Sequence, residues 1–568
     1  MRQRRPWLVI TLALTLIAFS CAIYVLRPPL AESSSTGFEV TIWRGDQPIS
    51  RKVYSILPAL IPLDDHRITI EPMRSDNQFL GRPLSSADRP LVEFLLLLPP
   101  ATLLICLLRN LVGMASFGTF APALLGLAFR DVHSLVGVFV MLTIITAGWW
   151  LRRGLNELHL LQVPRTALLL SGVVVLLLTL ITVLGGTGPL AISLFPLVIL
   201  TGMIERFWAM EEEDGTGNTF TVLGCTLLMA GLVCLLARLP GFAALLIDHP
   251  ELLGLPIAGQ LLLGRYTGLR WLERRRFAAI PRARVLGINA RNAFGILDRN
   301  PRGRFPIVDD KVLMMDLCRR IGVPCPAMLG LLSRHAQLAK LEQQLAPLNE
   351  FVLKPARGSG GRGIMVIIGR ENSLFRLANG QAVAIDVLRE RAAEILAGQF
   401  SLGGQPDRVL IQERVRPHPA LRMLAGHGVA DVRIVLYRFE PAMAMLRLPT
   451  LASGGRANLH QGGIGVGIDL TTGRTTSALA GRDIIDRHPD TGMPLADHVV
   501  PEWQTMLEMA TKVARAVGLG YVGIDIVLDE RYGPLLLEAN ARPGLAIQIV
   551  NQQGLVEVMD RINGVREA

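Results

Sequence analysis

The chain has 568 residues, of which 50% are hydrophobic and 18% charged, with a formal net charge of +11. An ordinary soluble enzyme carries about 25% charged residues, so the composition argues against a protein that is soluble throughout. Apolar residues dominate before about residue 265, and most of the charged residues follow. The composition predicts a membrane domain joined to a soluble domain.

The excess positive charge lies beside hydrophobic segments, as in Arg152 and Arg153 and in the run from Arg274 to Arg276. Cytoplasmic flanks of membrane spans have this composition because Lys and Arg resist translocation. We therefore expect no nucleic-acid partner. Four of the six cysteines lie in apolar runs, and Cys318 and Cys325 have neither CxxC nor zinc-site spacing. Reduced structural cysteines are expected.

Apolar segments long enough to cross a bilayer begin at the N-terminus. Residues 7–26 follow MRQRR and lack a small-residue cleavage site, which indicates an anchor rather than a signal peptide. Further candidate spans are residues 91–108, 115–130, 134–151, 167–184, 189–205, 219–237 and 250–264. About eight spans that start inside return the chain to the inside and keep the basic runs cytoplasmic. The sequence thus predicts an α-helical polytopic membrane domain.

Residues 27–90 are expected outside the membrane. FEVTIWR, KVYSIL and HRITIEP alternate apolar and polar residues, which predicts short strands in an extracytoplasmic β-rich segment. The acidic run from Glu205 to Asn218 is expected on the inner face. A solvated loop is one interpretation of that run, and a cation site or docking patch for the basic soluble half is the other.

The soluble half contains FVLKPARGSGGRGIMVII, in which GSGGRG fits the dinucleotide pattern G-x-G-x-x-G. That fingerprint requires a helix after the glycines, whereas the run from Ile364 to Ile368 predicts a strand. No Gly-Lys-Ser/Thr closes the loop, so it is not a P-loop. A glycine hairpin remains, whose backbone N–H groups can cover a polyphosphate with Lys354 reaching the phosphates. A purely structural hairpin is the alternative.

A second motif, YVGIDIVLDERYGPLLLEANARPG, predicts a strand, a turn and a strand. If Leu528 pairs with Leu535, Asp525 lies opposite Glu538, and Asn540 shares the face of Glu538. Two opposed carboxylates repel each other without a cation. Carboxylate and amide oxygens suit Mg²⁺, so the hairpin is a candidate metal site.

Several motifs in order resemble the ATP-grasp superfamily: DDK at Asp309 to Lys311, FVLKPARGSGGRGI, VLIQERV, ADVRIVLYR, GIDIVLD and LLLEANARPG. VLGINARNAFGILDRNPR and RANLHQGGIGVGIDL are similar to the glutamate-ligase-like, sugar-transfer-associated branch, and the resemblance covers roughly residues 280–560. The segment from LVEFLLLLPP to LERRRF resembles the seven-helix domain usually joined to an inactive transglutaminase-like module. This chain differs because it has room for only a short outer segment and carries the ligase-like domain itself.

The resemblance implies the residues that bind the nucleotide and the metal. The ATP phosphates would be held by Lys311, Lys354, Gly358, Ser359, Gly360, Gly361 and Gly363. The adenine and ribose would be lined by Gln412, Glu413 and Val415. Mg²⁺, expected as two ions, would be bound by Asp525, Glu538 and Asn540.

The resemblance also implies the residues that act on the substrate. The transferring phosphoryl group or the substrate acid would be stabilised by Arg433, Arg447 and Arg542. Asn458, with Arg447, would border the substrate pocket. His460 is expected either as a general base or as a hydrogen-bonded loop histidine.

Five segments are therefore expected. They are an anchor (1–26), the β-rich segment (27–90), a seven-helix membrane domain (91–265), a basic linker (266–280) and an α+β ATP-grasp domain (281–568). The function implied is a membrane-bound Mg·ATP-dependent carboxylate–amine ligase of the bacterial inner membrane that works through an acylphosphate. A small acid and an amine would be its substrates, and an envelope-biosynthesis or periplasmic protein its partner. The alternative is a transporter or signalling protein whose ATP-grasp domain binds nucleotide without ligating.

Overall fold

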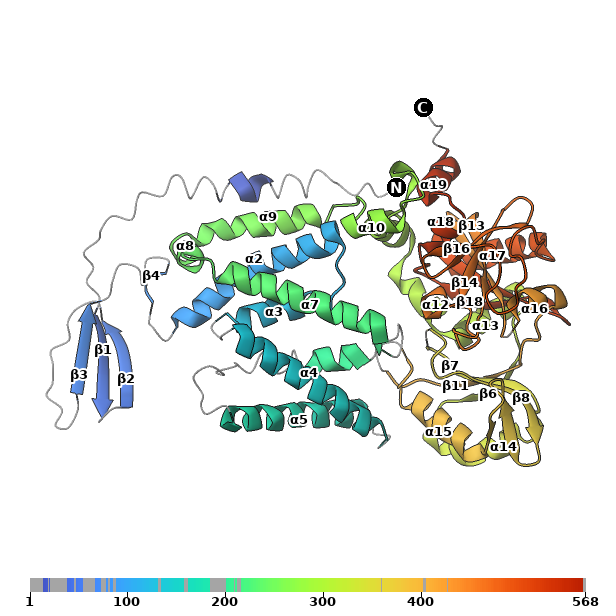
Figure 1. The fold of residues 1–568 in the computed structure, drawn as a ribbon, viewed down its shortest axis with the longest axis horizontal. Helices are drawn as coiled ribbons and strands as arrows, with labels where there is room; N and C mark the ends of the chain where they lie inside the picture. Colours follow the sequence, from blue (N-terminus) through green and yellow to red (C-terminus); the bar gives the residue numbers. More distant parts are fainter. Residues whose placement is uncertain are drawn as a thin grey trace. The chain divides into compact units, whose positions relative to one another are not determined.

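The computed structural model describes residues 14–18, 20, 38–44, 47–54, 67–72, 78–79, 82–84, 88–130, 134–157, 162–183, 201–208, 210–211, 216–358, 360–401, 405–426 and 428–564. The chain divides into two compact units (Figure 1). The first comprises Met1–Arg152, Leu169–Trp208 and Gly217–Tyr266, and the second comprises Arg153–Leu168, Ala209–Thr216 and Thr267–Ala568.

The first unit contains the expected strands and a set of apolar helices. Strands β1 (Phe38–Arg44), β2 (Gln47–Tyr54) and β3 (Arg67–Pro72) form an antiparallel sheet in the order β2-β1-β3, and β4 (Gln78–Phe79) pairs with β5 (Arg82–Pro83). The helices are α2 (Arg89–Leu107), η1 (Leu108–Val112), α3 (Phe120–Ala128), α4 (Ser134–Glu157), α5 (Gln162–Val183), α7 (Thr216–Ala237), α8 (Phe242–Asp248), η2 (Pro250–Leu253) and α9 (Gly254–Leu263). The strands predicted in residues 27–90 are thus present.

Of the helices that the structure describes, fewer qualify as membrane spans than the eight expected. Within the described part of the chain, Arg89–Val112 and Thr216–Ala237 are long and apolar enough to cross a bilayer. The pair Phe242–Asp248 and Pro250–Leu263 qualifies only together and is bent by 107°. The expected spans 7–26 and 189–205 lie largely outside the described residues, so the count of eight stays a prediction.

One expected span contains only a short helix. Residues 115–130 contain the nine-residue helix α3, and nine residues extend only about 14 Å, less than half of the hydrocarbon core. Gly113 and Gly118 have φ of 94° and 87° and separate α3 from the helix before it. Leu127 and Ala123 pack with residues of α2 and α7 in one apolar core. The segment therefore packs against the longer helices instead of spanning by itself.

The second unit contains two antiparallel sheets. The first has the order β10-β9-β8-β7-β11-β6, and its strands are β6 (Met328–Leu332), β7 (Phe351–Pro355), β8 (Met365–Glu371), β9 (Leu374–Leu377), β10 (Ala382–Val383) and β11 (Val409–Gln412). The side chains of α14 (Leu341–Leu345) and α15 (Ile385–Leu396) complete its core.

The second sheet is buried on both faces. Its order is β16-β15-β14-β13-β12-β17-β18, and its strands are β12 (Asp431–Tyr437), β13 (Glu440–Leu448), β14 (Ile464–Ile468), β15 (Thr475–Ala480), β16 (Asp483–Ile485), β17 (Tyr521–Asp529) and β18 (Gly533–Asn540). Helices α13 (Lys311–Ile321) and α17 (Trp503–Val517) share the core on one face, and α18 (Ala546–Val550) and α19 (Leu555–Asn563) share the core on the other. Every residue of β12 and β17 is buried, because alternate side chains enter alternate cores.

The short segment before α13 is anchored on the second sheet. It contains α10 (Trp271–Arg276), η3 (Arg282–Arg284), α11 (Ile288–Ala290), η4 (Arg291–Leu297), η5 (Arg302–Arg304) and α12 (Phe305–Asp309). The buried Asn300 side chain donates to the carbonyls of Tyr521 and Ala541, at 2.7 and 3.2 Å, and accepts from the N–H of Tyr521 at 2.9 Å. One amide thus ties this segment to the ends of β17 and β18.

Replacing Asn300 with alanine should lower the free energy of unfolding by about 1–3 kcal/mol, because three buried backbone groups lose a partner. Thermal unfolding of the full-length protein in detergent measures the change. Asn379→Ala is the matched control, since Asn379 is exposed and bonds only to Gln381 nearby. Equal effects of the two substitutions would contradict the anchoring role of Asn300.

Candidate active site

The glycine loop is a hairpin, as predicted. β7 and β8 pair antiparallel, with Phe351 opposite Ile367 and Leu353 opposite Met365, so a strand and not a helix follows the glycines. Gly360, Gly361 and Gly363 have φ between 63° and 73°, a conformation that costs glycine little. A Cβ on Gly363 would lie 2.6 Å from the ring of Phe400. Ser359 lies outside the described residues.

Both predicted phosphate lysines lie at this loop. Lys354, on β7, is 5% exposed, and burial together with repulsion from Lys311 lowers the pKa of its amine to about 7. Lys311, the first residue of α13, donates from Nζ to the carbonyl of Gly358 at 2.8 Å. The same Nζ lies 4.0 Å from Oε2 of Glu538 on β18. Lys311 therefore connects the glycine loop to the second sheet.

The β17–β18 hairpin has Asp525 directly opposite Glu538 and Gly523 opposite Asn540, as the sequence predicted. The predicted pairing of Leu528 with Leu535 is wrong by one residue, because Val527 pairs with Leu535. A bulge between Asp525 and Ile526 adds one residue to β18 and restores the register. Leu536 consequently stays in the apolar core although Glu538, two residues on, lies opposite Asp525.

Asp525 is fully buried between two arginines. Arg433 binds both of its carboxylate oxygens, at 2.7 and 2.6 Å, and Arg447 binds Oδ2 at 2.6 Å and also pairs with Asp431. Burial alone would raise the pKa of Asp525, but the two guanidinium groups outweigh it and hold the pKa below its usual value. The pKa of Asp431 is raised, first by burial and then by Asp525.

The two arginines neutralise charge that the sequence predicted a metal ion to neutralise. The repulsion that was expected to require a cation at Asp525 and Glu538 is relieved by Arg433 and Arg447. In the described part of the chain, no three His, Cys, Asp or Glu side chains form a metal cluster. Glu538 and Asn540 still fit Mg²⁺, which usually takes one or two protein carboxylates plus substrate phosphates. Asp525 could bind the metal only through a carboxylate lone pair that does not accept a hydrogen bond from the arginines.

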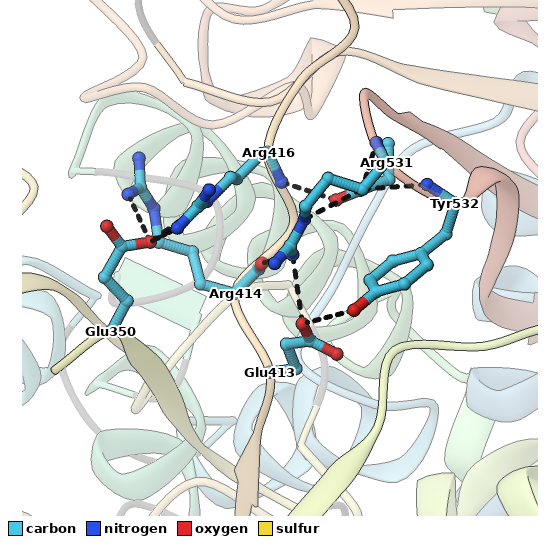
Figure 2. Close-up of polar contacts among 7 residues, drawn as sticks. Glu350, Glu413, Arg414, Arg416, Arg531 and Tyr532 are labelled. Atoms are coloured by element: carbon cyan, nitrogen blue, oxygen red, sulfur yellow. Dashed lines mark hydrogen bonds and ion pairs between the residues drawn. The ribbon is translucent and has the colours of Figure 1, made fainter. Parts of the chain in front are cut away.

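The segment that follows β11 is fixed by two groups of ion pairs (Figure 2). Glu413 accepts from Arg531 at 3.0 Å and from the hydroxyl of Tyr532 at 3.3 Å, both in the β17–β18 turn. On the other side, Arg414 and Arg416 donate to one oxygen of Glu350, at 3.2 and 3.3 Å. The carboxylate of Glu413, predicted to contact the nucleotide, thus has protein partners of its own.

Gln412 and Val415, the other residues predicted to contact the nucleotide, lie on either side of Glu413 in the chain. The side-chain amide of Gln412 is buried and donates to the carbonyl of Pro326 at 2.9 Å, so it supports the strand. Val415 is half-buried. Their contact with adenine stays a prediction.

The RANLHQGG loop reaches the glycine loop through a residue that the sequence did not single out. Gln461 donates from its side-chain amide to the carbonyl of Gly360 at 3.1 Å. Asn458 uses its Oδ1 to accept the N–H of His460 at 3.1 Å, and His460 is exposed. Their substrate roles stay predictions. Arg542 lies over the ring of Phe305, 5.7 Å from its centre.

Comparison with known proteins identifies both parts of the chain. Residues 291–564 match the family model "Sugar-transfer associated ATP-grasp", and residues 78–281 match the model "7 transmembrane helices usually fused to an inactive transglutaminase". The match to the second family indicates a membrane protein.

Two similar curated proteins are named as glutamate ligases. "Probable alpha-L-glutamate ligase 2" of Shewanella denitrificans is 23% identical over 231 residues, which cover 40% of this chain and 60% of that protein. "Probable alpha-L-glutamate ligase 1" of Shewanella frigidimarina is 24% identical, over 37% of this chain and 55% of that protein. The matched part thus spans less than two thirds of either relative.

Solved structures with similarity include D-cycloserine synthetase, at 13% identity and a TM-score of 0.27 over 47% of this chain and 73% of the other. The D-Ala:D-Ser ligase VanG from Enterococcus faecalis has 14% identity and a TM-score of 0.28, over 46% and 62% of the two chains. The C-terminal part of the chain thus matches the sugar-transfer associated ATP-grasp family, and the part before it matches the seven-transmembrane-helix family.

Proposed function

We propose that the protein is a membrane-bound Mg·ATP-dependent ligase that joins a carboxylate to an amine. The observation that carries this proposal is the convergence of Lys354, Lys311 and Glu538 at the glycine loop. Two lysine amines beside a glycine-rich loop suit a triphosphate, and a carboxylate within 4.0 Å of one of them suits its magnesium.

The chemistry follows from the poor leaving group of a carboxylate, which would be oxide. Transfer of the γ-phosphoryl group of ATP to a carboxylate oxygen gives an acylphosphate and ADP. The amine then attacks the acyl carbon, the C–O bond to phosphate breaks, and the amine loses a proton to give an amide. Mg²⁺, expected as two ions, would neutralise the phosphate oxygens.

Within this proposal the protein side chains bind and orient. Lys354 and Lys311 donate to the phosphates, and the N–H groups of the glycine loop cover them and exclude water. Arg433 and Arg447, fixed by Asp525, present charge to the transferring group or to the substrate acid. His460 is exposed and free to meet a substrate at the rim.

The proposed setting is the bacterial inner membrane, with the ATP-grasp domain in the cytoplasm where ATP is available. The acid would be associated with the cell envelope or delivered through the membrane, and an envelope-biosynthesis or periplasmic protein would be the partner. Glutamate is the first amine to test, because two relatives are named as glutamate ligases.

Glu538→Gln should lower ATP-dependent release of ADP and phosphate by at least about two orders of magnitude, because the carboxylate proposed to bind the metal is removed. Turnover of the full-length protein with candidate acids and glutamate measures it. Glu530→Gln, in the turn of the same hairpin and exposed, is the matched control and should keep full turnover. Full activity of Glu538→Gln would show that the metal site is elsewhere.

A second candidate function, transport or signalling with nucleotide sensing, is favoured by charge inside the membrane unit. Glu93, buried in α2, pairs with Arg89 at 2.9 Å and with Arg130. Ionisable residues inside spans usually mark a functional path. Nucleotide binding without turnover for any acid and amine, together with lost transport in Glu93→Gln, would support this candidate.

A further inference from the structure

The segment before α13 places an arginine beside the end of the β17–β18 hairpin. Arg291, the first residue of η4, donates from Nη1 to the carbonyl of Pro543 at 3.3 Å. Asn300 anchors the same segment on Tyr521 and Ala541. The position of Arg291 beside the residues after β18 is thus fixed at two points.

Arg291 has neutral hydrogen-bond partners. Its Nε and Nη2 donate to the side-chain oxygen of Asn292, at 3.3 and 3.0 Å, and its third contact is the Pro543 carbonyl. Among the described residues, no carboxylate lies within ion-pair distance of its guanidinium. Glu273, whose charge acts on Arg291 from beyond ion-pair distance, accepts the backbone N–H groups of Arg270 and Ile288.

A second cation, Arg542, immediately precedes Pro543, whose carbonyl Arg291 contacts. Arg542 follows the hairpin, and its backbone N–H donates to Asn540 at 2.8 Å, so its position is tied to the proposed metal ligands. Its guanidinium lies over Phe305, and in the described part of the chain it has no ion pair with a carboxylate. Burial raises the pKa of Asp309, and the charges of Arg542 and Lys311 offset part of this rise without forming an ion pair with it.

Electrostatics agrees with the contacts. The pKa of Arg291 is lowered, mainly by burial, and the charges of Arg270 and Arg542 lower it further, against Tyr521 and Glu273. A half-buried cation that repels its neighbours is stabilised by an anion placed between them. Guanidinium groups bind phosphate and carboxylate through paired N–H donors.

We propose that Arg291 and Arg542 form an oxyanion subsite that binds a phosphate or carboxylate group of the substrate other than the group that reacts. This proposal rests on the proposed ligase function and adds the substrate class, an acid that carries a second anionic group. Arg291 contacts Pro543, five positions beyond Glu538, and within the proposal this group lies apart from the nucleotide phosphates.

The test uses the full-length protein in detergent, saturated with Mg²⁺ and a non-hydrolysable ATP analogue so that the nucleotide phosphate site is filled. Inorganic phosphate and acetate are titrated separately at constant ionic strength, and binding is followed by the thermal midpoint. Saturable stabilisation by either anion is expected, and the stronger one identifies the group as phosphate or carboxylate.

Arg291→Gln should weaken that binding by at least about tenfold, because charged hydrogen bonds are lost, while Arg291→Lys should keep part of it. Arg284→Gln is the matched control, since Arg284 pairs with Glu557 at 3.3 Å on the same segment, and it should bind as wild type. If Arg291→Gln fails to fold, the exposed Arg542→Gln takes its place.

Two outcomes would overturn the subsite: neither anion stabilises the nucleotide-loaded wild type, or the arginine variants bind as tightly as wild type. Failure of the ligase proposal looks different, because the wild type would then not bind the ATP analogue or would not turn over. The two failures are therefore distinguishable in one preparation.

Discussion

Asp525→Ala should destabilise the ATP-grasp domain by about 3–5 kcal/mol, because Arg433 and Arg447 would remain buried without their shared carboxylate. The expected effect is a fall of roughly 10 °C in the thermal midpoint of the full-length protein. Asp525 was predicted from the sequence as a metal ligand. Its contacts instead predict that its loss destabilises the domain whether or not a metal ion binds.

A double substitution provides the control. Arg433→Met removes one of the two stranded cations, and Arg447 retains Asp431 as a partner. Arg433→Met with Asp525→Ala should therefore be less destabilised than the sum of the two single variants, by about 1–3 kcal/mol. If Asp525→Ala kept the wild-type thermal midpoint and lost only Mg-dependent turnover, the predicted loss of stability would be contradicted. Asp525 would then act mainly as a metal ligand.

Nucleotide binding should take up a proton above pH 7, because the pKa of Lys354 is lowered to about 7 and phosphate oxygens favour its charged form. Below pH 7 the amine is already protonated, and the affinity for Mg·ATP should be nearly constant. Above pH 7 the neutral amine must be protonated on binding, so the dissociation constant should rise by up to about tenfold per pH unit.

Calorimetry at pH 8 in two buffers of different ionisation enthalpy measures the proton directly, and the uptake should approach one per nucleotide. Lys354→Met should bind more weakly, by about tenfold or more, and should lose this uptake. Lys512→Met, at an exposed position of α17, should retain it. No proton uptake in the wild type would mean that Lys354 does not meet the phosphates.

The parts of the site that could be predicted are local in sequence. The strand after Gly363 follows from a β-branched run. The facing of Asp525 and Glu538 was predicted from a regular hairpin with a different pairing at the turn, and in the structure a bulge between Asp525 and Ile526 produces the same facing. Both depend on neighbours within about twenty residues. The resemblance to the ATP-grasp superfamily is confirmed by the family match to residues 291–564.

What could not be predicted depends on strand order and on contacts between distant segments. Arg433 reaches Asp525 because β12 lies between β13 and β17, an order that no local pattern specifies. The bond of Gln461 to Gly360 joins two loops about a hundred residues apart. The helix at 115–130 is shorter than expected, because apolar composition alone does not reveal where glycines end a helix. The other predicted segment boundaries and the substrate roles stay predictions.

The bulge in β18 has an evolutionary consequence. In a regular hairpin, one residue gained or lost at the turn moves every side chain of one strand to the opposite face. Here the extra residue lies between the turn and Glu538, so the stretch from Pro534 to Leu536 and the stretch from Glu538 to Asn540 follow separate registers. Turn length can therefore drift between related sequences, with the bulge lost or gained in compensation, while Glu538 keeps facing Asp525.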